Sequence, residues 1–383
     1  MATSEVSRLV QLFRNEGQSP WLDNLRREYL PSGELGELIS LGVRGLTSNP
    51  TIFQKAIQGS VAYDEQFREL MREGFDLAAI YWELVLSDIR DACQFFHNTY
   101  IESDGVDGFV SVEVDPHLAH DASATLVAAR QLDDRIDAKN VMIKIPATRE
   151  CVPIIRTMIS ESRNVNVTLI FSLERYSEVV EAYIAGLEDL ALDPEVSLSQ
   201  VASVASFFIS RVDSEVDMQL VTINTPESLH LRGLAAIAQA KLAYEIFQRA
   251  FSGPRWQALR ERGAQVQRPL WASTSTKDPA YPDTLYVDQL IGANSVNTLP
   301  ENTLHFFNDH GTVASTITRN LEAAHSTWSQ LKMVGINMDE VALKLEKEGV
   351  ASFQKSFDDL LDTLAEKRQK LSEASGTHDG QSK

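Results

Sequence analysis

Cysteine is nearly absent from this sequence, which holds only Cys93 and Cys151 among its 383 residues. Two cysteines this far apart offer neither a disulfide framework nor the spacing of a metal site, a pattern typical of a reducing compartment. Long apolar runs are also absent, so no segment has the character of a membrane span. The first residues carry Glu5 and Arg8 where a signal peptide needs an apolar core. The sequence therefore predicts a cytoplasmic protein with no membrane partner.

Positive charge is in short supply as well. Lys and Arg number 35 against 54 Asp and Glu, which gives a net charge of -19. An acidic surface repels phosphate backbones, so no nucleic-acid partner is expected, although a few local cations can still bind a phosphorylated small molecule. His117 and His120 lack further ligands at helical spacing, and no G-x-G-x-x-G turn is present. We therefore expect no metal and no organic cofactor.

What the sequence does contain is a regular alternation of short apolar segments with amphipathic helical segments. Eight candidate strands recur at intervals of about 25–45 residues, at 20–25, 43–50, 108–116, 141–146, 164–171, 202–211, 269–274, and 284–291 leading into 294–297. This rhythm predicts an α/β fold, a (β/α)8 TIM barrel. A doubly wound open sheet has the same local rhythm and comes second, because its Gly-rich turn is missing.

Helical spacing extends beyond the eight units at both ends. Residues 1–17 and the segment from Phe353 to Leu364 both keep apolar side chains on one helical face. We therefore expect additional N- and C-terminal helices around one barrel domain that covers residues 1–371. Residues 372–383 lose their apolar side chains and are expected to form a disordered tail.

The most informative strand is Val141–Pro146, because it places Lys144 among apolar side chains. Its neighbours on the same face, Met142 and Pro146, are both apolar, whereas a solvent-facing strand would alternate. Burial removes solvation from an amine, which favours the neutral, nucleophilic form that attacks a carbonyl to give a Schiff base. From this stretch alone, a buried lysine paired with a carboxylate, or an edge-strand lysine that prevents aggregation, explains the pattern equally well.

Other strands repeat the arrangement, with a polar residue on the face opposite the aliphatic positions. In a barrel that face points inward, and polar residues late in the strands converge at the C-terminal mouth, where barrel active sites lie. Any one of them alone is explained by a satisfied core hydrogen bond. Together, two carboxylates, two amides, a hydroxyl and an amine are costly to bury as packing. The residues are Asp23, Asn49, Glu113, Lys144, Asn166 and Thr168.

This set of groups suits chemistry through an imine. A neutral Lys144 amine adds to a ketone, and a nearby acid helps to expel water. The protonated imine then withdraws electrons from the adjacent carbon–carbon bond, which breaks as a base takes a proton. Carboxylates with separated pKa values can divide these proton transfers, while the amides and the hydroxyl hold sugar hydroxyls and a bridging water.

Several motifs in this order resemble the transaldolase family, over nearly the whole chain and most closely its longer bacterial form. They are residues 46–53 (LTSNPTIF), 110–115 (VSVEVD), 141–148 (VMIKIPAT), 164–172 (NVNVTLIFS) and 206–211 (SFFISR). The resemblance implies a (β/α)8 barrel that transfers a dihydroxyacetone unit from sedoheptulose 7-phosphate to glyceraldehyde 3-phosphate. The products are erythrose 4-phosphate and fructose 6-phosphate, in the non-oxidative pentose phosphate pathway, so the implied partners are sugar phosphates.

The same resemblance implies a role for each matching position. Lys144 is the Schiff-base lysine, and Asp23 is the acid/base during carbon–carbon cleavage and formation. Glu113, with Thr168, manages a catalytic water. The remaining matches bind substrate: Asn49 and Asn166 on the dihydroxyacetone moiety, Ser206 and Arg211 on the substrate with Arg211 on its phosphate, and Phe208 closing the pocket.

The sequence departs from the family in two places. Some transaldolases carry a second phosphate-binding arginine after the seventh strand, where this chain offers Ser273 and Lys277, and a lysine is a point charge rather than a bidentate fork. A glycine that often follows the lysine motif is replaced by the run from Arg149 to Val152, which we expect to change a loop and leave the chemistry intact. The oligomeric state stays open between a monomer and a homodimer.

Two other functions compete with the transferase. A lysine aldolase uses the same imine but releases dihydroxyacetone, or a phosphorylated triose, to water; free dihydroxyacetone formed without an aldehyde acceptor separates the two. A barrel kept as a non-catalytic scaffold or binding protein is expected to have lost at least one inner polar residue, and none of the expected catalytic positions is lost here. We therefore expect an enzyme, a transferase.

Overall fold

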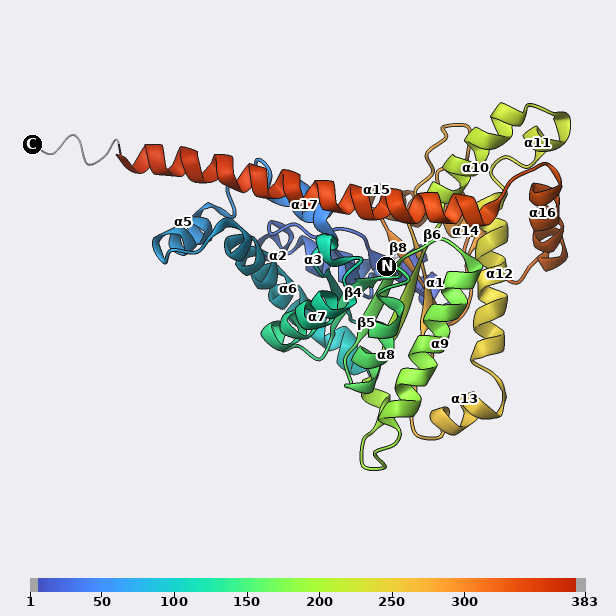
Figure 1. Ribbon diagram of the computed structural model, residues 1–383, viewed down its shortest axis with the longest axis horizontal. Helices are drawn as coiled ribbons and strands as arrows, with labels where there is room; N and C mark the ends of the chain where they lie inside the picture. The colour runs from blue at the N-terminus through green and yellow to red at the C-terminus, as the bar shows by residue number, and fades with distance from the viewer. Residues whose placement is uncertain (1–5, 377–383) are drawn as a thin grey trace, which may run out of the picture.

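Eight parallel strands close into a barrel in which each strand neighbours the next along the chain and β1 pairs with β8. The computed structural model describes residues 6–376 (Figure 1). The strands are β1 (Gln18–Leu22), β2 (Leu46–Thr47), β3 (Val110–Glu113), β4 (Val141–Pro146), β5 (Val165–Ile170), β6 (Ser203–Phe208), β7 (Arg268–Ala272) and β8 (Ser295–Leu299). The predicted (β/α)8 barrel is confirmed, and the open doubly wound sheet is wrong.

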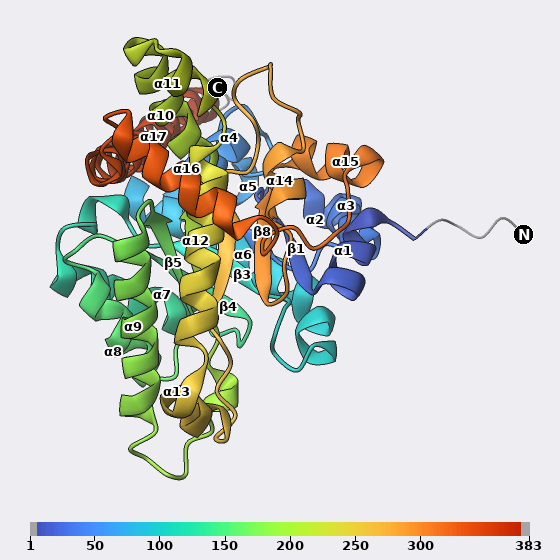
Figure 2. The same cartoon turned by 90° about the vertical axis from the view of Figure 1, so that its right-hand side faces the viewer.

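Helices cover the outside of the barrel, and Figure 2 shows α9 and α12 side by side along it. The helices are α1 (Arg8–Glu16), α2 (Tyr29–Ser32), α3 (Glu34–Leu41), α4 (Pro50–Ile57), α5 (Asp64–Arg72), α6 (Leu77–Glu102), α7 (Ala122–Ile136), α8 (Val152–Ser160), α9 (Leu173–Leu190), α10 (Ser210–Ile223), α11 (Pro226–His230), α12 (Ala235–Ala250), α13 (Gly253–Arg260), α14 (Leu285–Gln289), α15 (Glu301–His310), α16 (Leu321–Met333) and α17 (Met338–Gly376), with short 3-10 turns at Pro116–Leu118 and Leu198–Gln200. One face of each strand is covered by helices and the other points into the barrel. Every position of β4, β5 and β6 is therefore buried.

The eighth strand begins later than the sequence pattern predicted. Residues 284–291 contain the short helix α14 instead of a strand, and only the second half of the predicted segment lies in β8. The buried side chains Tyr286, Val287 and Leu290 recur at helical spacing. A short apolar run fits a strand or a turn of helix equally well, so its pattern alone does not decide between the two.

Two terminal helices flank the barrel, as predicted. α1 contacts β1 and α15, and α17 crosses the C-terminal end of the barrel and extends beyond it (Figure 1). α17 continues to Gly376, so residues 372–376 of the expected disordered tail are helical instead. The physical reason is the run of helix-favouring Ala, Glu, Lys, Gln and Leu residues at 365–374. Residues 1–5 and 377–383 lie outside the described part of the chain, and the expectation of a tail at 377–383 stays a prediction.

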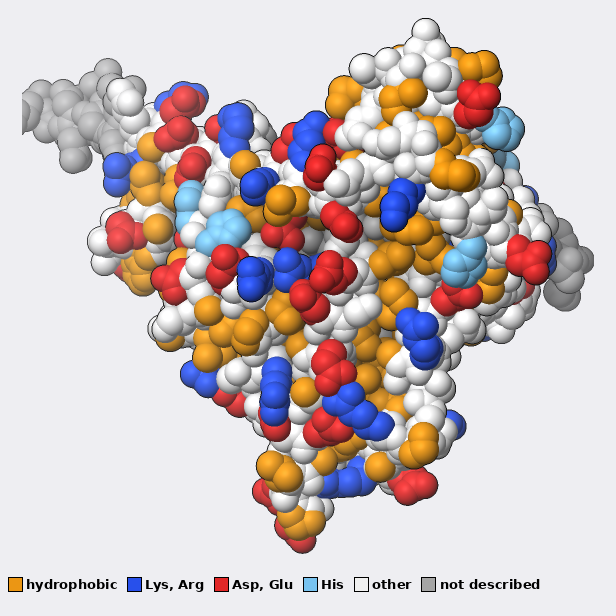
Figure 3. Space-filling model, turned by 45° about the vertical axis from the view of Figure 1, so that its right-hand side comes forward, with side chains coloured by type: hydrophobic (Ala, Val, Ile, Leu, Met, Phe, Trp, Pro, Cys, Tyr) orange, Lys and Arg blue, Asp and Glu red, His pale blue; other side chains and the backbone are white. Residues whose placement is uncertain are grey.

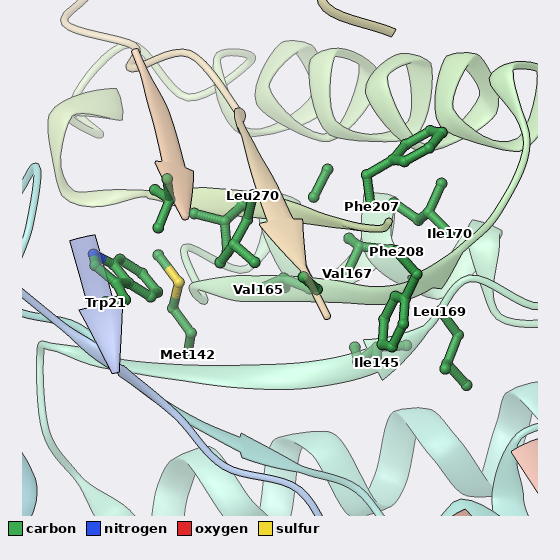
Figure 4. Close-up of a cluster of buried hydrophobic side chains, with 14 of the residues drawn as sticks. Trp21, Met142, Ile145, Val165, Val167, Leu169, Ile170, Phe207, Phe208 and Leu270 are labelled. Atoms are coloured by element: carbon green, nitrogen blue, oxygen red, sulfur yellow. The ribbon is translucent and has the colours of Figure 1, made fainter. Parts of the chain in front are cut away.

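The barrel interior changes from apolar to polar along the strands. Trp21, Met142 and Leu270 are buried and turn toward one another inside the barrel (Figure 4). Because side chains alternate along a strand, the next inward position of β4 after Met142 is Lys144. An apolar layer therefore lies directly beneath the polar one and closes the barrel below it.

The N-terminal end of the barrel is sealed by a buried network around Asp107. Its carboxylate accepts hydrogen bonds from Ser19 Oγ (2.8 Å), Trp21 Nε1 (3.1 Å), Arg44 Nε (2.7 Å) and Arg268 Nη2 (3.0 Å). Burial alone would raise the pKa of Asp107, but Arg268 and Arg44 together hold that pKa below its usual value. With this end filled by paired charges, the opposite, C-terminal end is left for a ligand.

The outer surface mixes charges of both signs. On the face shown in Figure 3, Lys and Arg side chains lie among Asp and Glu side chains without forming a continuous positive surface. Local pairing is common, as where Arg255 contacts both Glu181 and Glu188. Among residues 6–376, no helix combines the length and the apolar character needed to cross a bilayer.

Candidate active site

A cavity of about 390 Å³ opens at the C-terminal end of the barrel. Its walls come from residues at or just after the ends of most strands, together with α4, the start of α10 and α17. The C-terminal ends of the strands are where barrel enzymes bind their substrates. The predicted site residues that border it are Asp23, Asn49, Lys144, Thr168, Ser206, Phe208, Arg211, Ser273 and Lys277. Glu113 and Asn166 do not border the cavity, but each contacts a residue that does.

Lys144 lies at the floor of this cavity and is only 5% exposed. Its Nζ is 3.2 Å from Glu113 Oε2 and donates a hydrogen bond to the Ser48 carbonyl at 3.0 Å. The register between β3 and β4 places Glu113 directly opposite Lys144, so both side chains share the inner face. A closed barrel has no edge, which excludes the edge-strand explanation for this lysine. The pairing expected of a structural lysine is present, but the same amine also faces the cavity.

Two carboxyl groups flank this amine in surroundings that favour their protonated forms. Burial raises the pKa of Asp23, and Lys144 and a hydrogen bond from Thr47 Oγ1 (2.8 Å) oppose that rise. Burial also raises the pKa of Glu113, with Lys144 again opposing and the Asp23 carboxylate adding to the rise. A raised pKa makes a carboxyl group hold a proton more readily, which suits it to give and take protons in general acid–base catalysis.

The amide of Asn166 and the hydroxyl of Thr168 lie beside Lys144, and only some of their hydrogen-bonding atoms have partners. Asn166 lies opposite Lys144 in the β4–β5 register. Its Nδ2 donates to Ser111 Oγ (3.0 Å) and its Oδ1 accepts from Ser206 Oγ (2.7 Å). The buried Thr168 Oγ1 has no hydrogen-bond partner among residues 6–376. An unpaired buried hydroxyl is costly, so this group is available to a ligand or a water.

Asn49 has a structural role as well as a place in the cavity wall. It is the N-cap of α4, and its Oδ1 accepts a hydrogen bond from Ile52 N at 3.0 Å. The cap fixes the side chain and uses its oxygen, which leaves the amide NH2 group for a donor role. The proline at residue 50 starts α4 directly after this cap, a position that suits its fixed φ.

Positive charge gathers on one side of the cavity. Arg211 is the second residue of α10, and its guanidinium lies 5.1 Å from the Phe208 ring centre and 6.0 Å from that of Phe353. Lys277, in the loop after β7, donates to Ser275 Oγ at 2.7 Å. Among the described residues, neither cation has a carboxylate oxygen within 4 Å. Asp23, Glu113 and Glu348 act on Arg211 only from beyond contact distance, so this pair of cations at the mouth of the pocket is suited to an anion.

Ser273 connects this side of the cavity to the start of α10. Its hydroxyl is hydrogen-bonded to Ser210 Oγ at 2.9 Å, and its backbone has a left-handed φ of 56°. Non-glycine residues adopt that conformation at some cost, which is common where a loop is held in place for function. The loop that carries Lys277 is thereby tied to the helix that carries Arg211.

Sequence reasoning missed some residues of the cavity wall. Thr47, which donates a hydrogen bond to Asp23, lies inside the motif at residues 46–53, so its place in the motif indicates a position near the site. Lys55 lies on α4, six residues after Asn49, and nothing in its helical surroundings points to the barrel. Ser352 and Phe353 come from α17 and reach the cavity only because that helix crosses the mouth.

The model of the family described as Transaldolase/Fructose-6-phosphate aldolase matches residues 20–364. A protein named Transaldolase from Parafrankia sp. (strain EAN1pec) is 51% identical over 352 residues, covering 91% of this chain and 95% of that protein. The Transaldolase of Frankia alni is 48% identical over 352 residues, with 91% and 95% covered. That of Thermobifida fusca (strain YX) is 47% identical over 359 residues, with 93% and 97% covered.

Proposed function

The chain belongs to the Transaldolase/Fructose-6-phosphate aldolase family and is an enzyme, a transferase of the transaldolase type that acts on sugar phosphates, and we propose that Lys144 is its Schiff-base nucleophile. The observation that carries this proposal is a buried amine at the floor of the cavity that lies 3.2 Å from the Glu113 carboxylate and close enough to Asp23 for its charge to act on that group. A transaldolase moves a dihydroxyacetone unit from sedoheptulose 7-phosphate to glyceraldehyde 3-phosphate, in the non-oxidative pentose phosphate pathway.

The first half of the proposed reaction forms the imine. The Lys144 amine, neutral after passing a proton to Glu113, adds to the C2 carbonyl of the ketose. Glu113 then returns the proton, through a water held by the free Thr168 hydroxyl, and the carbinolamine loses water. The raised pKa of Glu113 suits a group that gives and takes a proton in turn.

The second half breaks and remakes a carbon–carbon bond. Asp23 takes the proton of the C4 hydroxyl, the C3–C4 bond breaks, and its electron pair moves toward the imine nitrogen to give an enamine. The aldehyde leaves, the acceptor aldehyde enters, and the same steps run in reverse. Asp23 is positioned for this by a hydrogen bond from Thr47, and burial raises its pKa, which helps it to hold a proton during the reaction.

The remaining residues bind the sugar in this proposal. Asn49 and Asn166 bind the dihydroxyacetone part, and Ser206 holds the substrate. Asn49 and Ser206 border the cavity, and Asn166 lies behind Ser206, whose hydroxyl donates to it. Arg211 binds the phosphate, with Ser273 and Lys277 beside it, and Phe208 closes the pocket. Residue 211 presents a guanidinium, whose planar fork matches a phosphate group.

Further parts of the proposal concern the molecule as a whole. We propose that residues 1–371 act as one domain, which the family match over residues 20–364 supports. We also propose a cytoplasmic location, a monomeric or homodimeric state, and a reaction without a metal or an organic cofactor. The family description also includes a fructose-6-phosphate aldolase, but the named relatives at 47–51% identity are transaldolases, which favours the transferase over the aldolase.

Borohydride reduction in the presence of fructose 6-phosphate tests the nucleophile directly. Reduction of the imine leaves a stable secondary amine, so we expect a sugar adduct on the peptide that contains Lys144. The measurement is mass spectrometry of the digested protein, with a sample reduced without sugar as the control. An adduct on a different lysine, or none at all, would overturn the proposal.

Glu113→Gln is expected to lower kcat by about 100-fold, the size typical of losing one general acid–base group. The amide keeps the shape of the side chain, so KM for fructose 6-phosphate should stay within about threefold of the native value. Steady-state kinetics measures both parameters. The matched control is Glu150→Gln, at an exposed carboxylate after β4. A large rise in KM with an unchanged kcat in Glu113→Gln would contradict the proton-transfer role.

A further inference from the structure

A third cation borders the cavity on the side of Arg211 and Lys277. Lys55 lies on α4, and its side chain is part of the cavity wall. Neither the motifs nor the chemistry of the imine uses it. Three elements that are far apart in the sequence, α4, α10 and the loop after β7, thus each bring one positive charge to the same cavity.

Arg211 and Lys55 both lie close enough to Lys277 for their charges to act on it. Burial lowers the pKa of Lys277, and the charges of Arg211 and Lys55 lower it further, while Asp23 opposes the change. Within residues 6–376, no carboxylate oxygen lies within 4 Å of Lys55, as is also true of the other two. In a chain with a net charge of -19, three cations that border one cavity and have no carboxylate in direct contact among the described residues indicate a site for an anion.

The helix that carries Lys55 is fixed in position relative to the other residues of the cavity. α4 begins at the Asn49 cap, and Thr51 Oγ1 is hydrogen-bonded to Ser356 Oγ of α17 at 2.7 Å. The helix is therefore fixed at its first turn by the residue proposed to bind the dihydroxyacetone part, and from above by the helix that crosses the mouth. Because α4 is fixed in this way, the Lys55 side chain starts from a fixed position relative to the Lys144 amine. A residue that binds the phosphate end of a sugar held on Lys144 needs such a position.

We propose that Lys55 binds the phosphate group of the sugar together with Arg211 and Lys277, and so contributes to the preference for phosphorylated substrates. This inference rests on the proposed function. A phosphate monoester carries a charge of about -1.5 to -2 at neutral pH, so two cations and a third at the rim match it better than a single guanidinium. Lys55 is exposed at the rim, which suits a group that meets the phosphate as the sugar enters.

The test compares Lys55→Gln with Lys139→Gln, which removes the same charge from an exposed lysine at the opposite end of the barrel, just before β4. In Lys55→Gln we expect KM for fructose 6-phosphate and the inhibition constant of inorganic phosphate each to rise about tenfold, the effect of one lost charge–phosphate contact of about 1.4 kcal/mol. Lys55→Arg should restore most of the loss, because it keeps the charge. Lys139→Gln should match the native enzyme in both constants.

Borohydride trapping of dihydroxyacetone, which has no phosphate, separates this inference from the proposed function. If native enzyme traps dihydroxyacetone on Lys144 while Lys55→Gln leaves both constants unchanged, the role of Lys55 is wrong and the Schiff base stands. If the native enzyme forms no adduct on Lys144, the proposed function fails first. A rise in both constants, with the adduct still formed in Lys55→Gln, supports the three-cation site.

Discussion

Lys144→Met is expected to lower kcat by roughly 10⁴-fold or more, since it removes the amine proposed to form the imine and losses of this size follow removal of a catalytic nucleophile. Methionine keeps the unbranched stem of lysine, so the packing against the inner face of the barrel is largely retained. Binding should survive better than turnover, because the sugar and phosphate contacts are made by other residues. Coupled-enzyme kinetics with fructose 6-phosphate and erythrose 4-phosphate measures the loss.

The control for Lys144→Met has to separate lost chemistry from lost folding. Glu113 loses its ion-pair partner in this variant, and burial already raises the pKa of its carboxyl group, so it can take up a proton instead of remaining charged. We therefore expect a cooperative thermal transition close to that of the native chain. Residual turnover above about 1% in a folded variant would show that another group supplies the covalent step.

Asp107→Ala is expected to reduce the free energy of unfolding by about 3–5 kcal/mol, the range seen when one member of a buried ion pair is removed. The substitution leaves the Arg44 and Arg268 guanidinium groups, the Trp21 indole and the Ser19 hydroxyl without their common acceptor. Urea unfolding at neutral pH measures the change. Asp91→Ala, at an exposed position of α6, is the matched control and should shift the stability by no more than about 0.5 kcal/mol.

The pH dependence of this effect has a defined sign. The pKa of Asp107 is lower in the folded chain than its usual value, so its ionised form stabilises the fold at all pH values above the ordinary pKa of an aspartate, about 4. That contribution is lost as the pH falls through the lowered pKa. The stability difference between native and Asp107→Ala protein should therefore narrow in acid. A difference that widens below pH 4, a pH near the usual aspartate pKa, would contradict this account of the network.

Much of the candidate site could be predicted from the sequence, because the relevant signal is local. A strand alternates its faces with a period of two, so a lysine between Met142 and Pro146 must face the barrel interior wherever β4 lies in the barrel. The same rule placed Glu113 and Asn166 on that face, and the β3–β4 and β4–β5 registers put both directly opposite Lys144. Burial accounts for their common place near the cavity, because unpaired polar groups are costly inside a barrel unless a ligand or water can bind them.

The errors were also local in origin. The predicted strand at 284–291 is a helix, because an apolar run of that length fits both structures and the choice depends on what the neighbouring segments leave to be covered. The disordered tail is predicted from residue 372, but the final helix continues to Gly376. The loss of apolar residues ends the buried face of a helix, whereas strong helix formers keep the backbone helical.

The sequence by itself determined which side chains line the interior of each strand and which of them are chemically able to form an imine, because both follow from alternation and residue type. Only the tertiary structure decided that Asp107 seals the lower end, that Phe353 reaches the mouth, and that Lys55 shares a cavity with Arg211. Asp107 binds Arg44 and Arg268, which lie 63 and 161 residues away along the chain, and barrel closure and helix crossing bring such segments together. Nothing in a local pattern encodes such distances, because the alternation along one strand is the same wherever its neighbours come from.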